Sequence, residues 1–313
     1  MKCRKCSRPA VINMRQHKLA LCDEHYPEWF IAQTQRAIEK YHMFTSDERI
    51  LVAVSGGKDS LALWDVLLQL GYQADGLYID LGIGLEREQI ADPDQAYSIA
   101  SRKYVEQFAA QRPHAHFTIV DLKTEYGETL PEVARRVQRG RKKPCAVCGL
   151  IKRHVMNRVT REGGYAALAT GHNLDDEVAV LFGNVLHWQT SYLARQAPVL
   201  PAAGDGLARK VKPFCRLYER ETAAYALITG IAYIYDECPY SVGATSLRHK
   251  GILSQMEEQS PGMKLQFYLG FLRARQSGFF CTQTEEVDLH PCPRCGQLTS
   301  APGLCAFCRL WER

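Results

Sequence analysis

A short glycine-containing segment that follows an apolar run constrains this chain most. Residues 50–54 are ILVAV, a run with the length of a buried strand, and residues 55–60 are SGGKDS. Paired glycines let backbone N–H groups approach an anion, and a helix that begins there adds its partial positive charge. Lys58 supplies a charge for phosphate oxygens, and Asp59 could hold Mg²⁺. The segment therefore predicts a phosphate site where a strand passes into a helix.

The spacing of this segment excludes a Walker A loop, which needs Gly-x-x-x-x-Gly-Lys-[Ser/Thr]. All six residues, Ser55, Gly56, Gly57, Lys58, Asp59 and Ser60, fit the pyrophosphatase loop (PP-loop) that they resemble. Enzymes with that loop cleave ATP between the α and β phosphates and adenylate a substrate carbonyl. A plain glycine turn between strand and helix is the alternative interpretation.

Hydrophobic periodicity predicts an α/β fold with a doubly wound parallel sheet. We expect strands at 50–54, 74–80, 115–120 and 165–169, and helices at about 27–41, 59–70, 93–111, 149–162 and 174–187. Ligands of such folds bind at the carboxyl ends of the strands. Both the glycine segment and residues 170–177, TGHNLDDE, are placed there. Residues 240–275 are expected to be mostly helical.

Composition fits an ordinary globular protein. A length of 313 residues favours about two domains, and hydrophobic residues make up 46% and charged residues 23% of the chain. We find no run of 18 apolar residues and no secretory signal. The cytoplasm is therefore the expected compartment, and no membrane partner is expected.

Eight of the metal-ligand residues gather at the two ends of the chain. Each end carries two close ligand pairs separated by a short loop, a spacing typical of tetrahedral structural zinc sites. The N-terminal set is Cys3, Cys6, Cys22 and His25, and the C-terminal set is Cys292, Cys295, Cys305 and Cys308. Unliganded or redox-active cysteines are the alternative. Four protein ligands leave no open position, so we expect two structural Zn²⁺ ions.

A third cysteine pair, Cys145 and Cys148, stands at an expected helix start, where a thiolate is favoured. Cys238 lies far along the chain and could complete a three-thiolate site, which spacing alone leaves open. Cys215 and Cys281 have no partner pattern and are expected to be packed or surface thiols.

A local basic cluster precedes that cysteine pair. Residues 135–143 carry six positive charges in nine positions: Arg135, Arg136, Arg139, Arg141, Lys142 and Lys143. The net charge of +5 is mild, so the local density matters more than the total. Beside a predicted ATP site the cluster favours contact with RNA phosphates over a merely solvated loop. The terminal modules could add RNA-binding surface or could bind protein.

Together these motifs resemble the TtcA/TtuA family of PP-loop tRNA 2-thiolation enzymes, most closely its TtuA branch. The resemblance covers nearly the whole chain, including both terminal fingers, which the cytidine-thiolating branch lacks. It implies that Cys145, Cys148 and Cys238 bind a [4Fe–4S] cluster, whose fourth iron would be open to hold sulfur. Lys152 and Asp176 match polar family positions near the nucleotide. Ala53, Ile79 and Gly171 match backbone contacts to ATP.

The resemblance implies an ATP-dependent sulfurtransferase that modifies a tRNA uridine, with 5-methyluridine at T-loop position 54 as the expected target. Lys58, Asp59, Lys152 and Asp176 are the expected catalytic residues, with Mg²⁺ near Asp59 and Asp176. The expected partners are tRNA, a ubiquitin-like sulfur carrier with a C-terminal thiocarboxylate, and a second copy of the chain in a homodimer.

Four alternatives stay open at this point. The target could be a wobble uridine, the cysteines could act as a persulfide pair without a cluster, or the enzyme could be a PP-loop ligase that transfers no sulfur. The chain could also be a non-enzymatic zinc-finger RNA-binding protein with a vestigial nucleotide fold, against which the intact Lys58, Asp59 and Ser60 argue. The expected domain division is an N-terminal finger at 1–27, a catalytic domain at 28–240, a helical region at 241–287 and a C-terminal finger at 288–313.

Overall fold

The centre of the molecule is a six-stranded sheet. The computed structural model describes residues 1–84, 96–137, 144–202, 206–241, 243, 245–280 and 289–312. The strands are β3 (Arg49–Ala53), β4 (Gln73–Asp80), β5 (Phe117–Asp121), β6 (Ala167–Thr170), β7 (Val199–Leu200) and β8 (Lys210–Val211). Their order is β5-β4-β3-β6-β8-β7, parallel from β5 to β8, whereas β7 pairs antiparallel with β8. The predicted α/β fold is confirmed, with one antiparallel edge strand added.

The direction in which the chain crosses the sheet reverses at β3. From β3 the chain passes through α2 (Lys58–Gln69) to β4 and through α3 (Tyr97–Ala110) to β5, whereas β6 returns to the other side of β3. In a parallel sheet such a reversal leaves a crevice beyond the carboxyl ends of the two central strands. The PP-loop segment and residues 171–176 both leave the sheet at this crevice.

Successive residues of a strand point to opposite faces of a sheet. Apolar residues of β3 point to both faces, and helices cover both of them. Ile50 and Val52 of β3 belong to one core cluster, and Leu51 between them belongs to a second. The first cluster includes side chains of α1 (His25–Lys40), α2, α3, α8 (Leu174–Leu186), α10 (Glu219–Ile228), α11 (Thr245–Gln259) and α12 (Met263–Gln276). The second includes side chains of α5 (Leu130–Arg136) and α7 (Pro144–Glu162).

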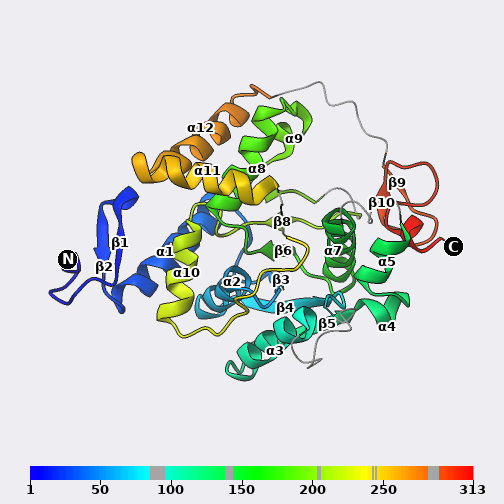
Figure 1. The fold of residues 1–313 in the computed structure, drawn as a ribbon, viewed down its shortest axis with the longest axis horizontal. Coiled ribbons are helices and arrows are strands. Elements are labelled where there is room, and N and C mark those ends of the chain that lie inside the picture. The colour runs from blue at the N-terminus through cyan, green and yellow to red at the C-terminus, as the bar shows by residue number, and fades with distance from the viewer. Residues whose placement is uncertain are drawn as a thin grey trace.

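Two small modules stand at opposite ends of the molecule in Figure 1. The N-terminal one contains the hairpin β1 (Ile12–Met14) and β2 (Leu19–Leu21), joined by the 3₁₀ turn η1 (Arg15–His17). The C-terminal one contains β9 (His290–Pro291), β10 (Leu298–Thr299) and the 3₁₀ turn η3 (Cys308–Trp311).

The division into four domains stays a prediction. Among the described helices, none is both long enough and apolar enough to span a membrane.

The sequence predicted most of the long elements and missed the short ones and α10. Each of the four predicted strands and five predicted helices has a counterpart, and residues 240–275 contain α11 and α12. Outside the terminal modules, the missed elements are α4 (Leu122–Tyr126), α5, α9 (Thr190–Arg195), α10 and the two-residue strands β7 and β8. The short strands and 3₁₀ turns within the modules were not predicted either. Two residues cannot display a period of two, so such strands are defined only by their hydrogen-bonding neighbours. The start of the predicted helix at 93–95 lies outside the described residues.

The C-terminal module is docked on α7 by stacking and hydrogen bonds. The rings of His154 and Phe307 stack with centroids 3.5 Å apart and planes 4° from parallel. Gln297 Nε2 donates to the His154 carbonyl at 3.0 Å, and Asn157 Nδ2 donates to Gln297 Oε1 at 3.2 Å. Burial, helped by the nearby Arg158 charge, lowers the pKa of His154 to about 4. The docked module therefore holds this histidine neutral.

This burial predicts a pH-dependent stability. The unfolded chain protonates His154 near pH 6.5, whereas the folded protein protonates it only near its pKa of about 4. The contribution is therefore complete above pH 6.5 and is lost as the pH falls from 6.5 towards 4. At pH 5.5 the loss is on the order of 1 kcal/mol.

We expect the thermal midpoint of His154→Phe, measured in zinc-containing buffer, to fall less than that of wild type between pH 7 and 5.5. His114→Phe, at an exposed position, is the control and should follow wild type. Equal decreases in all three proteins would contradict the assignment to His154.

Candidate active site and metal centres

The PP-loop segment presents the uncapped start of a helix. β3 ends at Ala53, and α2 begins at Lys58 with Gly57 as its N-cap. No side chain caps α2, so the first N–H groups of the helix have no side-chain acceptor. Ser60 Oγ donates to the Gly57 carbonyl at 2.9 Å and accepts from the Ser55 N–H at 3.1 Å, which holds the loop in shape. The arrangement fits an anion such as a phosphate.

Glycine is required at two close approaches around this loop. Gly56 has φ +77°, and a Cβ there would lie 2.4 Å from the Ser101 carbonyl oxygen of α3. A Cβ on Gly171, just after β6, would lie 2.8 Å from the backbone carbonyl of Asp59. Both residues therefore let backbone from neighbouring elements pack directly against the loop.

Five charged side chains beside the PP-loop form consecutive ion pairs, so that negative and positive groups alternate. Lys58 Nζ lies 2.9 Å from an oxygen of Asp59 and 2.9 Å from an oxygen of Glu219. Lys250 Nζ, from α11, lies 2.9 Å from the other Glu219 oxygen and 2.6 Å from Asp176. We call these five residues the charge chain. Its three carboxylates and two ammonium groups leave one negative charge, which suits a divalent cation.

Glu219 is the middle of the charge chain. Burial alone would raise its pKa, but the ammonium groups of Lys250 and Lys58 outweigh burial and lower the pKa to about 2. Burial likewise opposes the charge on Lys58 and Lys250, and their carboxylate partners raise the pKa of both. All three groups are therefore charged at neutral pH.

The cap of α8 ties the two aspartates together. Asn173 accepts from the Asp176 N–H at 3.1 Å, and the Asn173 N–H donates to Asp176 Oδ2 at 3.0 Å. The Asn173 side-chain amide also donates to Asp59 Oδ1 at 3.2 Å, and the Thr222 hydroxyl donates to the same oxygen. The two carboxylates predicted to lie near Mg²⁺ are thus joined through one residue.

The predicted backbone contacts to ATP lie on neighbouring strand ends. Ala53 is the last residue of β3, Ile79 is the penultimate residue of β4, and Gly171 follows β6. Since β4, β3 and β6 are adjacent in the sheet, the three residues line one edge beside the PP-loop. The uncapped helix, two cations and two linked carboxylates together fit a nucleotide with its metal ion.

The segments of the third cysteine group contact each other. Cys145 and Cys148 lie in the first turns of α7, and Cys145 Sγ donates to the Tyr240 carbonyl at 3.0 Å, two residues beyond Cys238. Burial, followed by the charges of Cys238 and Cys148, raises the pKa of Tyr97 to about 12. All three residues pack against the second core cluster. Burial raises the pKa of Cys148, and the Lys152 ammonium one turn along α7 opposes this.

The spacing of these three thiols differs from that of a single-ion site. Among the described residues, the sets of ligand atoms that all lie within 4.8 Å of one another are the two terminal ones. In a [4Fe–4S] cluster each thiolate binds a different iron, so its sulfurs lie farther apart than around one ion. A loose group of three thiols fits a cluster better than a zinc ion.

The terminal sets fit tetrahedral zinc. Zn–S bonds of about 2.3 Å place neighbouring sulfurs about 3.8 Å apart. The Sγ atoms of Cys6 and Cys22 are 3.7 Å apart, as are those of Cys295 and Cys305. The two complete sets are Cys3, Cys6, Cys22 and His25, and Cys292, Cys295, Cys305 and Cys308.

The basic cluster is described only at its start. Arg139, Arg141, Lys142 and Lys143 lie outside the described residues. Arg135 and Arg136 are exposed on α5. Arg136 donates to Glu128 at 2.6 Å and to the Leu310 carbonyl at 2.6 Å, so it helps to hold the C-terminal module.

Four residues of this site escaped the sequence reasoning: Asn173, Glu219, Thr222 and Lys250. Asn173 could have been found, because Asn173-x-x-Asp176 before an apolar helix is a capping signal. Glu219, Thr222 and Lys250 are 46 to 77 residues beyond Asn173 and follow no motif. Only packing of α10 and α11 against the PP-loop shows their role.

Comparison with known proteins adds five findings. Residues 2–27 match the model of the 2-thiouridine synthetase TtuA N-terminal LIM domain, and residues 48–189 match that of the tRNA methyl transferase HUP domain. The chain is 48% identical to tRNA-5-methyluridine(54) 2-sulfurtransferase of Thermus thermophilus, over 100% of this chain and 91% of that protein. It is 42% identical to the Pyrococcus horikoshii protein of the same name, over 99% and 94%. The U34-tRNA thiolase NcsA from Methanococcus maripaludis, solved with its [4Fe–4S] cluster, has a similar fold, with a TM-score of 0.74, 23% identity and 88% of each chain covered.

The close approach at Gly56 generates a prediction. In Gly56→Ala the new Cβ meets the Ser101 carbonyl at a backbone angle that costs alanine about 1 kcal/mol or more, so the loop must shift. We expect ATP affinity, measured by calorimetry with a non-hydrolysable analogue, to fall at least about tenfold.

Gly127→Ala is the matched control, because Gly127 has φ +82° but open space around its Cβ position. This variant should lose some stability and keep its ATP affinity. Unchanged affinity in Gly56→Ala would show that the loop does not bind the nucleotide.

Proposed function

Because this chain belongs to the tRNA-5-methyluridine(54) 2-sulfurtransferase family, we propose that it replaces the C2 oxygen of 5-methyluridine at T-loop position 54 of tRNA with sulfur. The enzyme is a tRNA 2-thiolating sulfurtransferase. The finer assignment of position 54 is supported by 48% identity over the full chain to an enzyme of that name. The U34 thiolase NcsA is only 23% identical, a likeness of fold, so wobble uridine is the weaker candidate.

In the proposed reaction the PP-loop binds the phosphates of ATP. The C2 oxygen of the uridine attacks the α-phosphorus, and an O–P bond forms. The bond between the α-phosphorus and the oxygen that bridges to the β-phosphorus breaks, and pyrophosphate leaves with that oxygen. Negative charge develops on the phosphate oxygens, where Lys58 and the N–H groups at the start of α2 stabilise it. Sulfur then replaces the adenylated oxygen at C2, and AMP leaves.

Mg²⁺ would be held by Asp59 and Asp176. Its two positive charges reverse the sign of the charge chain, from one negative to one positive. Because Lys58 is bound to Asp59 and Lys250 to Asp176, a metal ion on these carboxylates would release both ammonium groups towards the phosphates. The negative site thus favours ATP together with its metal ion over ATP alone.

Cys145, Cys148 and Cys238 would hold a [4Fe–4S] cluster, which supplies an open iron position for sulfur when bound. The support is the loose three-thiol group, and NcsA, of the same fold, is a thiolase with such a cluster. Lys152 lies one turn beyond Cys148 on α7, where its charge would steady the base or the phosphate during transfer. A PP-loop ligase would have no use for these three cysteines.

The remaining proposals concern metals and partners. Two structural Zn²⁺ ions in the terminal sets would contribute folding free energy to modules with little core of their own. tRNA is the substrate. The proposed sulfur donor is a ubiquitin-like carrier with a C-terminal thiocarboxylate. A homodimer and a cytoplasmic location complete the proposal.

The first test is metal content. Anaerobically reconstituted wild type should contain about four irons and four sulfides, absorb broadly near 400 nm, and retain two zincs per chain. Cys238→Ala should lose the iron and the thiolation of tRNA and keep its zinc. Cys215→Ala, at a fully buried thiol outside the group, is the control and should keep its iron. Full activity of Cys238→Ala would contradict the proposal.

A second test addresses the charge chain. Lys250→Met removes one ammonium group that we assign to the phosphates, so the KM for ATP should rise at least about tenfold while tRNA affinity is unchanged. Lys250→Arg should recover part of the loss, and Arg248→Met, at an exposed position of the same helix, should behave as wild type. An unchanged KM in Lys250→Met would limit that residue to a structural role.

A further inference from the structure

We propose that a basic hollow on the N-terminal module binds the phosphate backbone of the RNA substrate at a distance from the ATP site. The hollow has a volume of about 290 Å³ and is lined by Met1, Arg4, Asn13, Arg15, Lys18 and Leu19, among others. Its lining contains three cations and no carboxylate. The inference rests on the proposed function, because that function brings tRNA to this chain.

The three cations lack acidic partners. Within the described residues, no carboxylate lies within 4 Å of the charged groups of Arg4, Arg15 or Lys18, and all three are exposed. Two other cations of the module are neutralised, since Lys5 pairs with Glu28 at 3.4 Å and Arg8 pairs with Asp23 and Glu24. Of the lysines and arginines at 1–24 for which no ion pair is found within the described residues, all but Lys2 therefore lie at the hollow.

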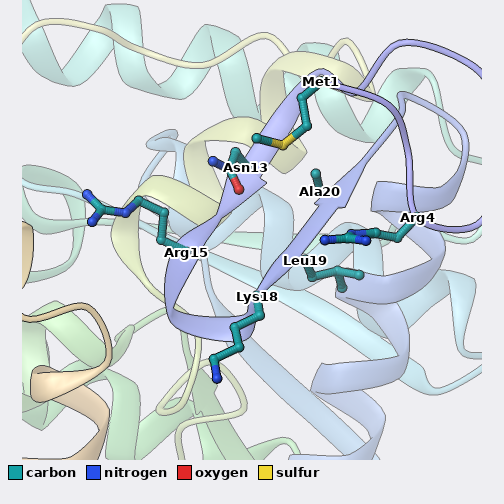
Figure 2. A pocket seen from close by; sticks show the side chains of 7 residues that line it. All are labelled: Met1, Arg4, Asn13, Arg15, Lys18, Leu19 and Ala20. Atoms are coloured by element: carbon teal, nitrogen blue, oxygen red, sulfur yellow. The ribbon is translucent and has the colours of Figure 1, made fainter.

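The hollow is built on a fixed hairpin. β1 and β2 pair with Asn13 opposite Ala20, and the Arg4 N–H donates to the Ala20 carbonyl at 2.9 Å. Lys18 closes the turn in the left-handed region, with φ 51°, and its N–H donates to the Arg15 carbonyl at 3.1 Å. In Figure 2, Arg15 and Lys18 project from the turned end of the hairpin, and Arg4 lies near Leu19.

This layout fits a polyanion better than a single phosphate. The cations are spread around the hairpin and do not converge on one point (Figure 2), so one small anion could not contact all of them. An RNA strand presents a series of phosphates, with riboses between them. The Asn13 amide could bond a ribose hydroxyl, and Met1 and Leu19 offer an apolar wall to sugar or base.

The hairpin turn is connected to the active site through α10. Between the outward-pointing Arg15 and Lys18, Gln16 Nε2 donates to Glu221 Oε1 at 2.8 Å, and His17 Nε2 lies 3.0 Å from the same oxygen. Tyr26, in the first turn of α1, donates its hydroxyl to the Glu221 carbonyl at 2.6 Å.

α10 also carries Glu219 and Thr222, which contact Lys58 and Asp59. RNA held at the hollow is therefore placed at a fixed distance from the PP-loop, so the hollow would position the tRNA and take no part in the chemistry.

The test neutralises the hollow with Arg4→Gln, Arg15→Gln and Lys18→Gln in one zinc-loaded, full-length protein. We expect the Kd for unmodified tRNA to rise at least about tenfold. The slope of log Kd against log salt should fall by about two to three, roughly one for each phosphate that the protein no longer neutralises. The KM for ATP should not change.

The matched control carries Arg36→Gln, Arg161→Gln and Arg309→Gln, three exposed arginines for which no ion pair is found within the described residues. It lowers the net charge equally, so it should change tRNA binding much less. Equal decreases of tRNA affinity in both triple variants would show that the affinity depends only on the total charge of the protein, and would overturn the proposal.

Two further outcomes are informative. If wild type neither binds nor thiolates tRNA, the proposed function fails. If wild type does both and the hollow variant binds tRNA with unchanged Kd and salt slope, the inference fails while the function stands. Loss of thiolation with unchanged tRNA binding would assign the hollow to a protein partner and overturn the RNA assignment.

Discussion

The parallel pairing of β3 with β6 is the constraint on which the site depends. It places the ends of two strands that are more than 100 residues apart in the sequence side by side, so that the PP-loop and the cap of α8 share one crevice. The pairing would bring backbone into collision at the crevice if Gly171 carried a side chain. One glycine thus permits Asn173 to reach Asp59, and through it the two carboxylates act as one unit.

Ion pairs connect two later helices to the site. The charge chain takes one member from α10, which follows the short strand β8, and one from α11, which follows another helix. A second lysine of the helical region, Lys264 on α12, lies 2.5 Å from Asp175, beside Asp176. Helices α11 and α12 are therefore both held by ion pairs to the start of α8, and α11 contributes a cation to the proposed nucleotide site.

The terminal modules are extensions of the two sides of this site. The N-terminal module is bound to α10, which carries Glu219, and the C-terminal module is bound to α7, which carries Cys145, Cys148 and Lys152. Each module is too small to bury a core alone, so its docking and the proposed metal ligation would both stabilise it. Because α10 and α7 also carry residues of the site, a movement of either module would displace those residues.

The sequence by itself determined the local features. SGGKDS after an apolar run, closely spaced Cys/Cys and Cys/His pairs and alternating strands and helices each depend on neighbours within a few residues. The α/β fold, the two terminal sets of candidate metal ligands and the PP-loop were therefore all predictable. Tertiary structure decided the partners of Lys58 and Asp176, the roles of Glu219 and Lys250, the edge strands β7 and β8, and the grouping of cations around the hollow. The reason is physical, because an ion pair depends on distance in space, and no spacing along the chain records which side chains packing brings within 3 Å of one another.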